Sequence, residues 1–156
     1  MENIIVALSN FTSLLPIYTS YIHNDNITTY IILFASLASV TSHLVENHKH
    51  GMPGIGFSKK TSYYLNQVDV FGYILVGMRM VYLYYHKYGP NIFPFLQQKK
   101  LIFFILVFFI ILRVSEHDKY NPNLKKLYMI THCIWHVGIF IILNEFLTSL
   151  IYQSKN

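Results

Sequence analysis

The sequence predicts an all-α fold: a polytopic membrane helix bundle of about five transmembrane helices, built as a single domain over residues 1–156. The first reason is composition, because 53% of the residues are hydrophobic and only 12% are charged, roughly half the charged share of soluble domains. The second is that the apolar residues form long blocks, of which residues 101–112 contain no polar side chain. The third is the single cysteine, which excludes a disulfide scaffold.

The first two helices are predicted over residues 4–22 and 27–46. Because the turn at residues 23–26 is short, the two helices should form an antiparallel pair. Pro16 lies inside the first helix, which a membrane helix tolerates where its neighbours satisfy the freed backbone groups. Glu2 stands where a cleavable signal would be basic, and no small-residue cleavage site follows. We therefore expect the first helix to be retained.

Three further helices are predicted over residues 62–86, 100–114 and 124–152. The loop at residues 48–56 is rich in glycine and proline, and the segment 88–98 contains two further prolines, so neither is expected to be a regular helix. Pro122 stands near the first turn of the last helix, a position that proline favours. The fourth helix is the shortest, so it should extend by a turn or thin the bilayer locally.

The net charge of +5 would suggest nucleic acid in a soluble protein. Here the lysines and arginines lie mainly between the apolar blocks, where basic residues mark loops and contact lipid headgroups. No basic patch interleaved with aromatic residues stands outside the predicted helices. We therefore expect an integral membrane protein whose partner is a membrane lipid, and no nucleic-acid binding.

Three of the predicted helices carry polar side chains at helical spacing. Such groups are costly inside a membrane and usually face the bundle interior. Two sets follow i, i+3, i+7 and one follows i, i+4, so each set shares one helix face. The sets are Ser36, Ser39 and His43; Asn66, Asp69 and Tyr73; and His132 with His136.

The histidines predict a zinc site. Zinc binds neutral imidazole nitrogens, and a catalytic site uses three protein ligands plus a water whose pKa the metal lowers towards neutrality. His132 and His136 would supply two ligands from one helix face, and His43 the third. Asp69 could accept the proton of the water or orient a ligand. Ser39, one turn before His43, could donate a hydrogen bond to a developing oxyanion.

Depth and topology agree with this site. His43 lies about 5 Å from the end of its helix, Asp69 about 10 Å from the start of the third helix and His132 about 12 Å from the start of the fifth. With five spans, these three helix ends emerge on the same side of the membrane. One span more or fewer after the third helix would separate the histidine pair from His43.

Simpler roles for the same residues stay open. A histidine in an apolar helix is more often a satisfied core residue than a ligand. Asp69 could cap its helix or pair with Arg79 or Lys60, and Ser39 could hydrogen-bond to its own helix. His48 and His50 are expected to be solvated loop residues. Tyr63, Tyr64 and Trp135 are expected to be interfacial or packing aromatics.

The order of these motifs resembles the CREST superfamily, which includes alkaline ceramidases, progestin and adipoQ receptors, hydrolases that remodel GPI lipids, and myomaker-like transmembrane hydrolases. The matching elements are Ser39-x-x-x-His43, Asp69 early in the next helix, and His132-x-x-x-His136 in the last helix. The myomaker-like branch is the most similar. Its first-helix, third-helix and last-helix motifs resemble residues 7–16, Leu65-x-x-x-Asp69-x-x-Gly72 and His132-x-x-Trp135-His136.

This resemblance implies an intramembrane zinc site with His43, His132 and His136 as ligands, assisted by Ser39 and Asp69. Relatives of this kind hydrolyse lipid amides or esters, such as ceramide or the acyl chain of GPI anchors, whereas others act in cell fusion or bind ligands. Two departures stand out. The superfamily has seven helices, so about five would be a reduced form, and the paired cysteines of some relatives are replaced by Val45 and Glu46.

The sequence thus predicts a zinc-dependent hydrolase of a lipid amide or ester, ceramidase-like or GPI-lipid acyl hydrolase-like. The first alternative is a non-enzymatic membrane protein of the same fold, in which a structural zinc joins the second and last helices and the surface serves fusion or receptor-like contacts. The second alternative is a b-type haem protein that uses His43 opposite His132 or His136.

Overall fold

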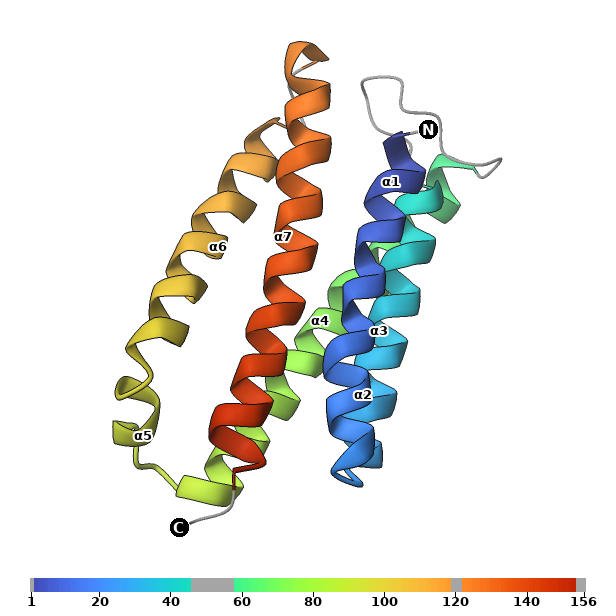
Figure 1. Ribbon diagram of the computed structural model, residues 1–156. Coiled ribbons are helices and arrows are strands. Elements are labelled where there is room, and N and C mark those ends of the chain that lie inside the picture. The colour runs from blue at the N-terminus through green and yellow to red at the C-terminus, as the bar shows by residue number, and fades with distance from the viewer. Residues whose placement is uncertain (1, 46–57, 119–121, 154–156) are drawn as a thin grey trace.

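The part of the chain that the structure describes is helical, as the sequence predicts. The computed structural model describes residues 2–45, 58–118 and 122–153, and Figure 1 shows them as a bundle of long helices. In chain order the elements are α1 (Glu2–Ser9), the 3₁₀ turn η1 (Asn10–Ser13), α2 (Leu14–Ile22), α3 (Asn26–Val45), α4 (Lys59–Tyr88), the one-turn α5 (Phe93–Leu96), α6 (Lys99–Asp118), the 3₁₀ turn η2 (Pro122–Leu124), α7 (Lys125–Phe146) and the π-helical turn η3 (Leu147–Ile151).

Most of the predicted helix positions are confirmed to within a turn. α6 runs to Asp118, one turn beyond the predicted end at residue 114, as its short apolar block required. The segment between α4 and α6, predicted as irregular, contains the single helical turn α5. The glycine- and proline-rich loop with His48 and His50 lies outside the described residues.

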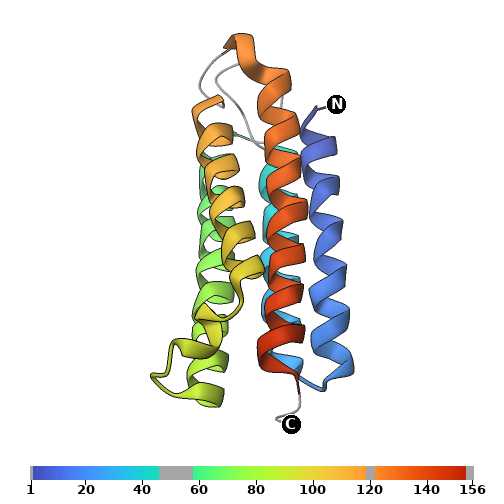
Figure 2. The ribbon, with the colours of Figure 1, turned by 60° about the vertical axis from the view of Figure 1, so that its left-hand side comes forward.

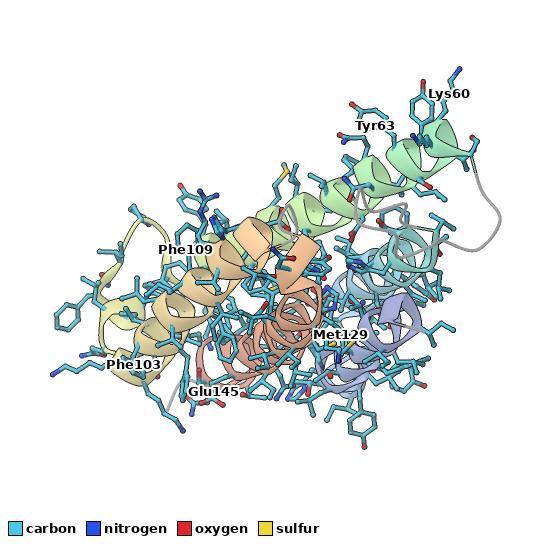
Figure 3. The ribbon with its side chains drawn as sticks, turned by 90° about the horizontal axis from the view of Figure 1, so that it is seen from above. Lys60, Tyr63, Phe103, Phe109, Met129 and Glu145 are labelled. Atoms are coloured by element: carbon cyan, nitrogen blue, oxygen red, sulfur yellow. The ribbon has the colours of Figure 1, made fainter. Side chains whose placement is uncertain are left out.

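The helices pack as two pairs joined by the first helix. α4 packs against α3, and α6 packs against α7. The continuous rod formed by α1, η1 and α2 contacts both α3 and α7, which links the two pairs (Figure 1 and Figure 2). Seen from above, α4 crosses the bundle obliquely (Figure 3). α4 and α6 share no extensive interface, so the bundle is least closed between them.

The backbone hydrogen bonds of the first rod change from α-helical to 3₁₀-helical spacing just before Pro16. Proline has no N–H to donate, and the turn that precedes it tightens into the 3₁₀ turn η1. Two side-chain hydroxyls in this stretch donate hydrogen bonds to backbone carbonyls. Ser9 Oγ donates to the Val6 carbonyl at 2.6 Å, and Thr12 Oγ1 donates to the Ser9 carbonyl at 3.0 Å. The rod continues through Pro16, because η1 runs directly into α2 at Leu14.

A glycine sets the distance between α3 and α4. A Cβ added to Gly72 would lie 2.9 Å from Ala35 Cα and 3.1 Å from Ala35 Cβ. Such contacts between small residues let two helix backbones approach closely, which is a common means of helix association in membranes. Asp69 stands one turn before Gly72 on α4, so this contact also sets how deeply Asp69 enters the bundle.

A partly buried charge network closes the opposite end of the bundle. Arg79 donates from a guanidinium nitrogen to Asp25 Oδ1 at 2.9 Å and from Nε to Thr28 Oγ1 at 2.9 Å. Tyr152 donates to Asp25 Oδ2 at 3.1 Å. Burial alone would raise the pKa of Asp25, but the hydrogen bonds from Thr28 and Arg79 and the arginine charge outweigh it and hold that pKa below 3.8. Arg79 therefore pairs with Asp25, and the alternative in which Asp69 caps its helix or pairs with Lys60 stays a prediction.

The bundle buries many polar side chains beside its apolar core and exposes many large apolar ones. The buried residues include many hydroxyls, three histidines and Asp69, whereas large apolar side chains are exposed on every long helix. Extensive exposed apolar surface is unusual for a soluble monomer. Three helices are long and apolar enough to cross a membrane, by length and composition: Ile4–Ile22, Asn26–Val45 and Lys126–Ile151.

The close approach at Gly72 predicts a selective effect of added volume. Gly72→Val should destabilise the protein by about 1–3 kcal/mol, because the new side chain overlaps the α3 backbone. Gly77→Val is the matched control, since a Cβ there meets nothing within 4 Å. Thermal unfolding of both variants in detergent measures the difference, and equal midpoints would contradict the contact.

Candidate metal centre

Three histidines meet in the interior of the bundle. His43 comes from the last turn of α3, and His132 and His136 come from successive turns of α7. The ring centroids of His43 lie 4.9 Å from those of both α7 histidines, which are 4.7 Å from each other. One ring nitrogen from each histidine lies within 4.8 Å of the others. All three side chains are buried, so the sequence prediction that these residues converge is confirmed.

Apolar packing lower in the bundle fixes this meeting. Ile32 of α3 contacts Phe140, Leu143 and Leu147 of the last helix in a buried cluster. Because α3 and α7 are held together there, the histidines that lie towards their other ends reach the same depth. The i, i+4 spacing of His132 and His136 then presents both rings to α3.

Hydrogen bonds define the tautomer of His136. Ser9 Oγ has one proton and donates it to the Val6 carbonyl at 2.6 Å. If Ser9 keeps its proton on the Val6 carbonyl, the 2.7 Å contact with His136 Nδ1 places a proton on Nδ1, which donates it to Ser9. Nε2 of His136 then carries the lone pair that a metal ion needs.

Asn10 lies on the same side of His136. Its Nδ2 is 3.2 Å from Nδ1 of the histidine, while its buried Oδ1 has no hydrogen-bond partner among the described residues. The same Nδ2 donates to the Val6 carbonyl at 3.4 Å, so the amide group presents its donor side to the histidine. An amide N–H beside Nδ1 favours an unprotonated Nδ1, so Asn10 does not support the tautomer that the Ser9 contact indicates.

His132 has an equivalent partner on α6. Ser115 Oγ lies 2.9 Å from His132 Nδ1, and Ser115 is fully buried. The two α7 rings are therefore each held at Nδ1 by a serine hydroxyl from a different helix. With Nδ1 engaged in this way, Nε2 is the ring nitrogen left to bind a metal, as is typical of metal-binding histidines.

The donor set fits zinc. Neutral imidazoles are common zinc ligands, and one ring nitrogen from each of the three histidines lies within 4.8 Å of the others. No carboxylate or thiol of the described residues joins this group of three. Three protein ligands leave one tetrahedral position for water or substrate, which is the pattern of catalytic zinc sites, whereas structural sites use four.

The cluster opens onto a cavity of about 640 Å³ between α4, α6 and α7. Its lining includes all three histidines together with Asn66, Asp69 and Tyr73, the polar face predicted for α4. Trp135, expected to be an interfacial or packing residue, also lines this cavity. Asp69 is buried and lines the same cavity as the three imidazoles.

Ser39 is fully buried on α3, one turn before His43. It lies close to Tyr73, which is also close to Asp69, but it is not among the residues that line the cavity. Its predicted role as an oxyanion donor stays a prediction. The direct packing of the imidazole rings on one another leaves no gap for a macrocycle between them and gives the haem alternative no support.

Sequence analysis assigned no site role to Ser9, Asn10 and Ser115. These residues come from the first helix and from the end of α6, where serine and asparagine have many other uses. The only signal for Ser9 and Asn10 is that they fall within the first-helix motif of the resemblance. Ser115 lies one residue beyond the predicted end of its helix, so no helical face could be assigned to it.

One comparison with known proteins identifies a relative along the whole chain. "Uncharacterized protein L282" of Acanthamoeba polyphaga mimivirus is 55% identical over 152 residues, which cover 97% of this chain and 100% of that protein. No protein-family model matches the chain. No solved structure matches it.

The hydroxyl contacts predict a measurable effect on metal binding. Ser9→Ala and Ser115→Ala should each weaken zinc binding by about 10- to 100-fold, because loss of the Nδ1 partner frees the ring orientation and tautomer. Competition with a fluorescent chelator measures this affinity. Ser149→Ala is the control, since its hydroxyl bonds only to a carbonyl of its own helix. Unchanged zinc affinity in both variants would show that the hydroxyls do not position the rings.

Proposed function

The chain belongs to the family of the mimivirus protein L282, and we propose that it is a membrane enzyme that hydrolyses an amide or ester bond of a lipid with zinc held by His43, His132 and His136. One observation carries this proposal. The three buried imidazoles open onto a cavity of about 640 Å³ that also contains Asp69. A metal with an open coordination position beside a buried carboxylate is a typical arrangement for hydrolysis.

In this proposal the membrane surrounds five spans. The first rod, α3 and α7 are long and apolar enough to cross. α4 and α6 would be the other two, with α4 carrying its polar groups on the face towards the cavity and α6 containing the uncharged block at residues 101–112. The exposed apolar side chains on these two helices suit contact with lipid tails.

We further propose that this family is a reduced branch of the CREST superfamily. The support is that motifs widely separated in the sequence, at residues 39–43, 69 and 132–136, come from different helices and gather around one cavity or beside it. Five spans would leave the space between α4 and α6 less covered than in a bundle of seven helices. A lipid could reach the cavity from that side.

Different residues of the chain would bind the metal, position its ligands and transfer the proton. The three imidazoles bind the metal through Nε2, while Ser9 and Ser115 hold two of the rings at Nδ1. When bound, zinc acidifies water and polarises a carbonyl oxygen. Asp69 would accept a proton from the water and return it to the leaving group. The apolar residues of the cavity wall exclude water around an acyl chain.

A structural role for the same metal is the alternative. The histidines lie on α3 and α7, and their hydroxyl partners lie on α1 and α6, so a bound ion would tie four helices to one point. Such a protein would act by contacts, as in membrane fusion or ligand reception. It would lose thermal stability without metal and release no lipid product.

The hydrolase proposal predicts the effect of one substitution. Asp69→Asn keeps the side-chain volume but removes the proton acceptor, so turnover should fall by at least about 100-fold while the thermal midpoint stays near that of the wild type. Mass spectrometry of products from proteoliposomes containing ceramides or GPI-like lipids measures turnover. Asp25→Asn is the control for loss of a carboxylate outside the cavity; it should reduce stability more than turnover.

Two outcomes would count against the proposal in different ways. Wild-type turnover in Asp69→Asn would remove Asp69 from the mechanism. Absence of product from every lipid tested, in wild-type protein that contains zinc and loses stability on chelation, would favour the structural role.

A further inference from the structure

A second cavity, of about 320 Å³, lies between α6 and α7 away from the histidines. It includes Glu145, nine residues beyond His136 on α7, which corresponds to about 13 Å along the helix axis. Its walls are apolar side chains from the two helices: Leu101, Phe104, Phe108, Ile141 and Ile142. It is therefore a site separate from the proposed metal centre, with the shape and chemistry of a groove for a hydrocarbon chain.

Two opposite charges stand at the rim of this groove. Lys100, at the start of α6, and Glu145, near the end of α7, both line it. Both side chains are exposed, and Glu145 lies at the periphery of the bundle (Figure 3). Within the described parts of the chain, neither charge takes part in an ion pair.

A carboxylate on this face of α7 is costly in a membrane. Glu145 lies within the apolar stretch Lys126–Ile151, where an ionised side chain is disfavoured unless it reaches water, headgroups or a charge partner. Lys100 can extend to the headgroup level, since lysine buries its methylene groups and keeps its ammonium in a polar layer. The pair therefore marks the depth at which the groove meets the lipid headgroups.

We propose that this groove binds a zwitterionic phospholipid. The phosphate would pair with Lys100, the ammonium of the headgroup would pair with Glu145, and one acyl chain would lie along the apolar walls. Charge complementarity selects this class, because an anionic headgroup without an amine would satisfy Lys100 but leave Glu145 without a positive partner. The inference rests on the membrane embedding of the proposed function and not on zinc or hydrolysis.

Native mass spectrometry of the full chain in detergent tests this site. Phosphatidylethanolamine and phosphatidylglycerol with the same acyl chains are added separately, and the bound fraction is compared. The wild type should bind phosphatidylethanolamine at least about threefold more tightly, as expected for one additional exposed charge contact. Glu145→Gln should remove this preference, and Lys100→Gln should weaken the binding of both lipids.

Lys99→Gln is the matched control, because Lys99 is the exposed neighbour of Lys100 and does not line the groove; it should bind as the wild type does. Size-exclusion profiles and zinc content establish that each variant is folded and that the metal centre is intact. Equal binding of the two lipids by the wild type would overturn the proposal. So would a preference that survives Glu145→Gln, since the lipid would then be bound without the predicted charge pair.

Discussion

The convergence of three imidazoles in the bundle interior is the constraint on which the rest of the structure depends. Buried polar groups destabilise a protein unless they find partners, and in a membrane those partners must come from the protein or a bound ion. Serine hydroxyls from α1 and α6 satisfy the outer nitrogens of the two α7 rings. The inner nitrogens then face one another around a point that a cation can occupy. This requirement ties the depth and rotation of four helices to one another.

The remainder of the bundle keeps that geometry in place. Hydroxyl pairs join the first rod to α3, with Ser13 and Ser36 at 2.7 Å and Ser20 and Thr29 at 2.9 Å. At the end away from the cavity, the Arg79–Asp25 ion pair at 2.9 Å joins α4 to the turn before α3. The bundle is thus cross-linked by polar contacts at one end and opens between α4 and α6 at the other, where the proposed chemistry takes place.

Helical periodicity and apolar blocks were enough to predict the long helices and the meeting of His43, His132 and His136. The reason is that their depths follow from counting residues from the helix ends, and the number of spans decides on which side they emerge. The partners of those histidines were not predictable in the same way. Ser9 and Ser115 act through the rotation of their helices about their own axes, which depends on close packing such as Gly72 against Ala35. The ion-pair partner of Arg79 was also not predictable, because Asp25 lies 54 residues away in the sequence, in a turn.

The central claim is that the three histidines bind one metal ion. Elemental mass spectrometry of detergent-purified wild-type protein, beside the double variant His132→Ala/His136→Ala, tests it most directly. We expect about one zinc per wild-type chain, as a single three-ligand site requires, and its loss in the double variant. If well-folded wild-type protein purified without chelators contains no zinc, the three histidines do not form a zinc site, and the hydrolase proposal is lost as well.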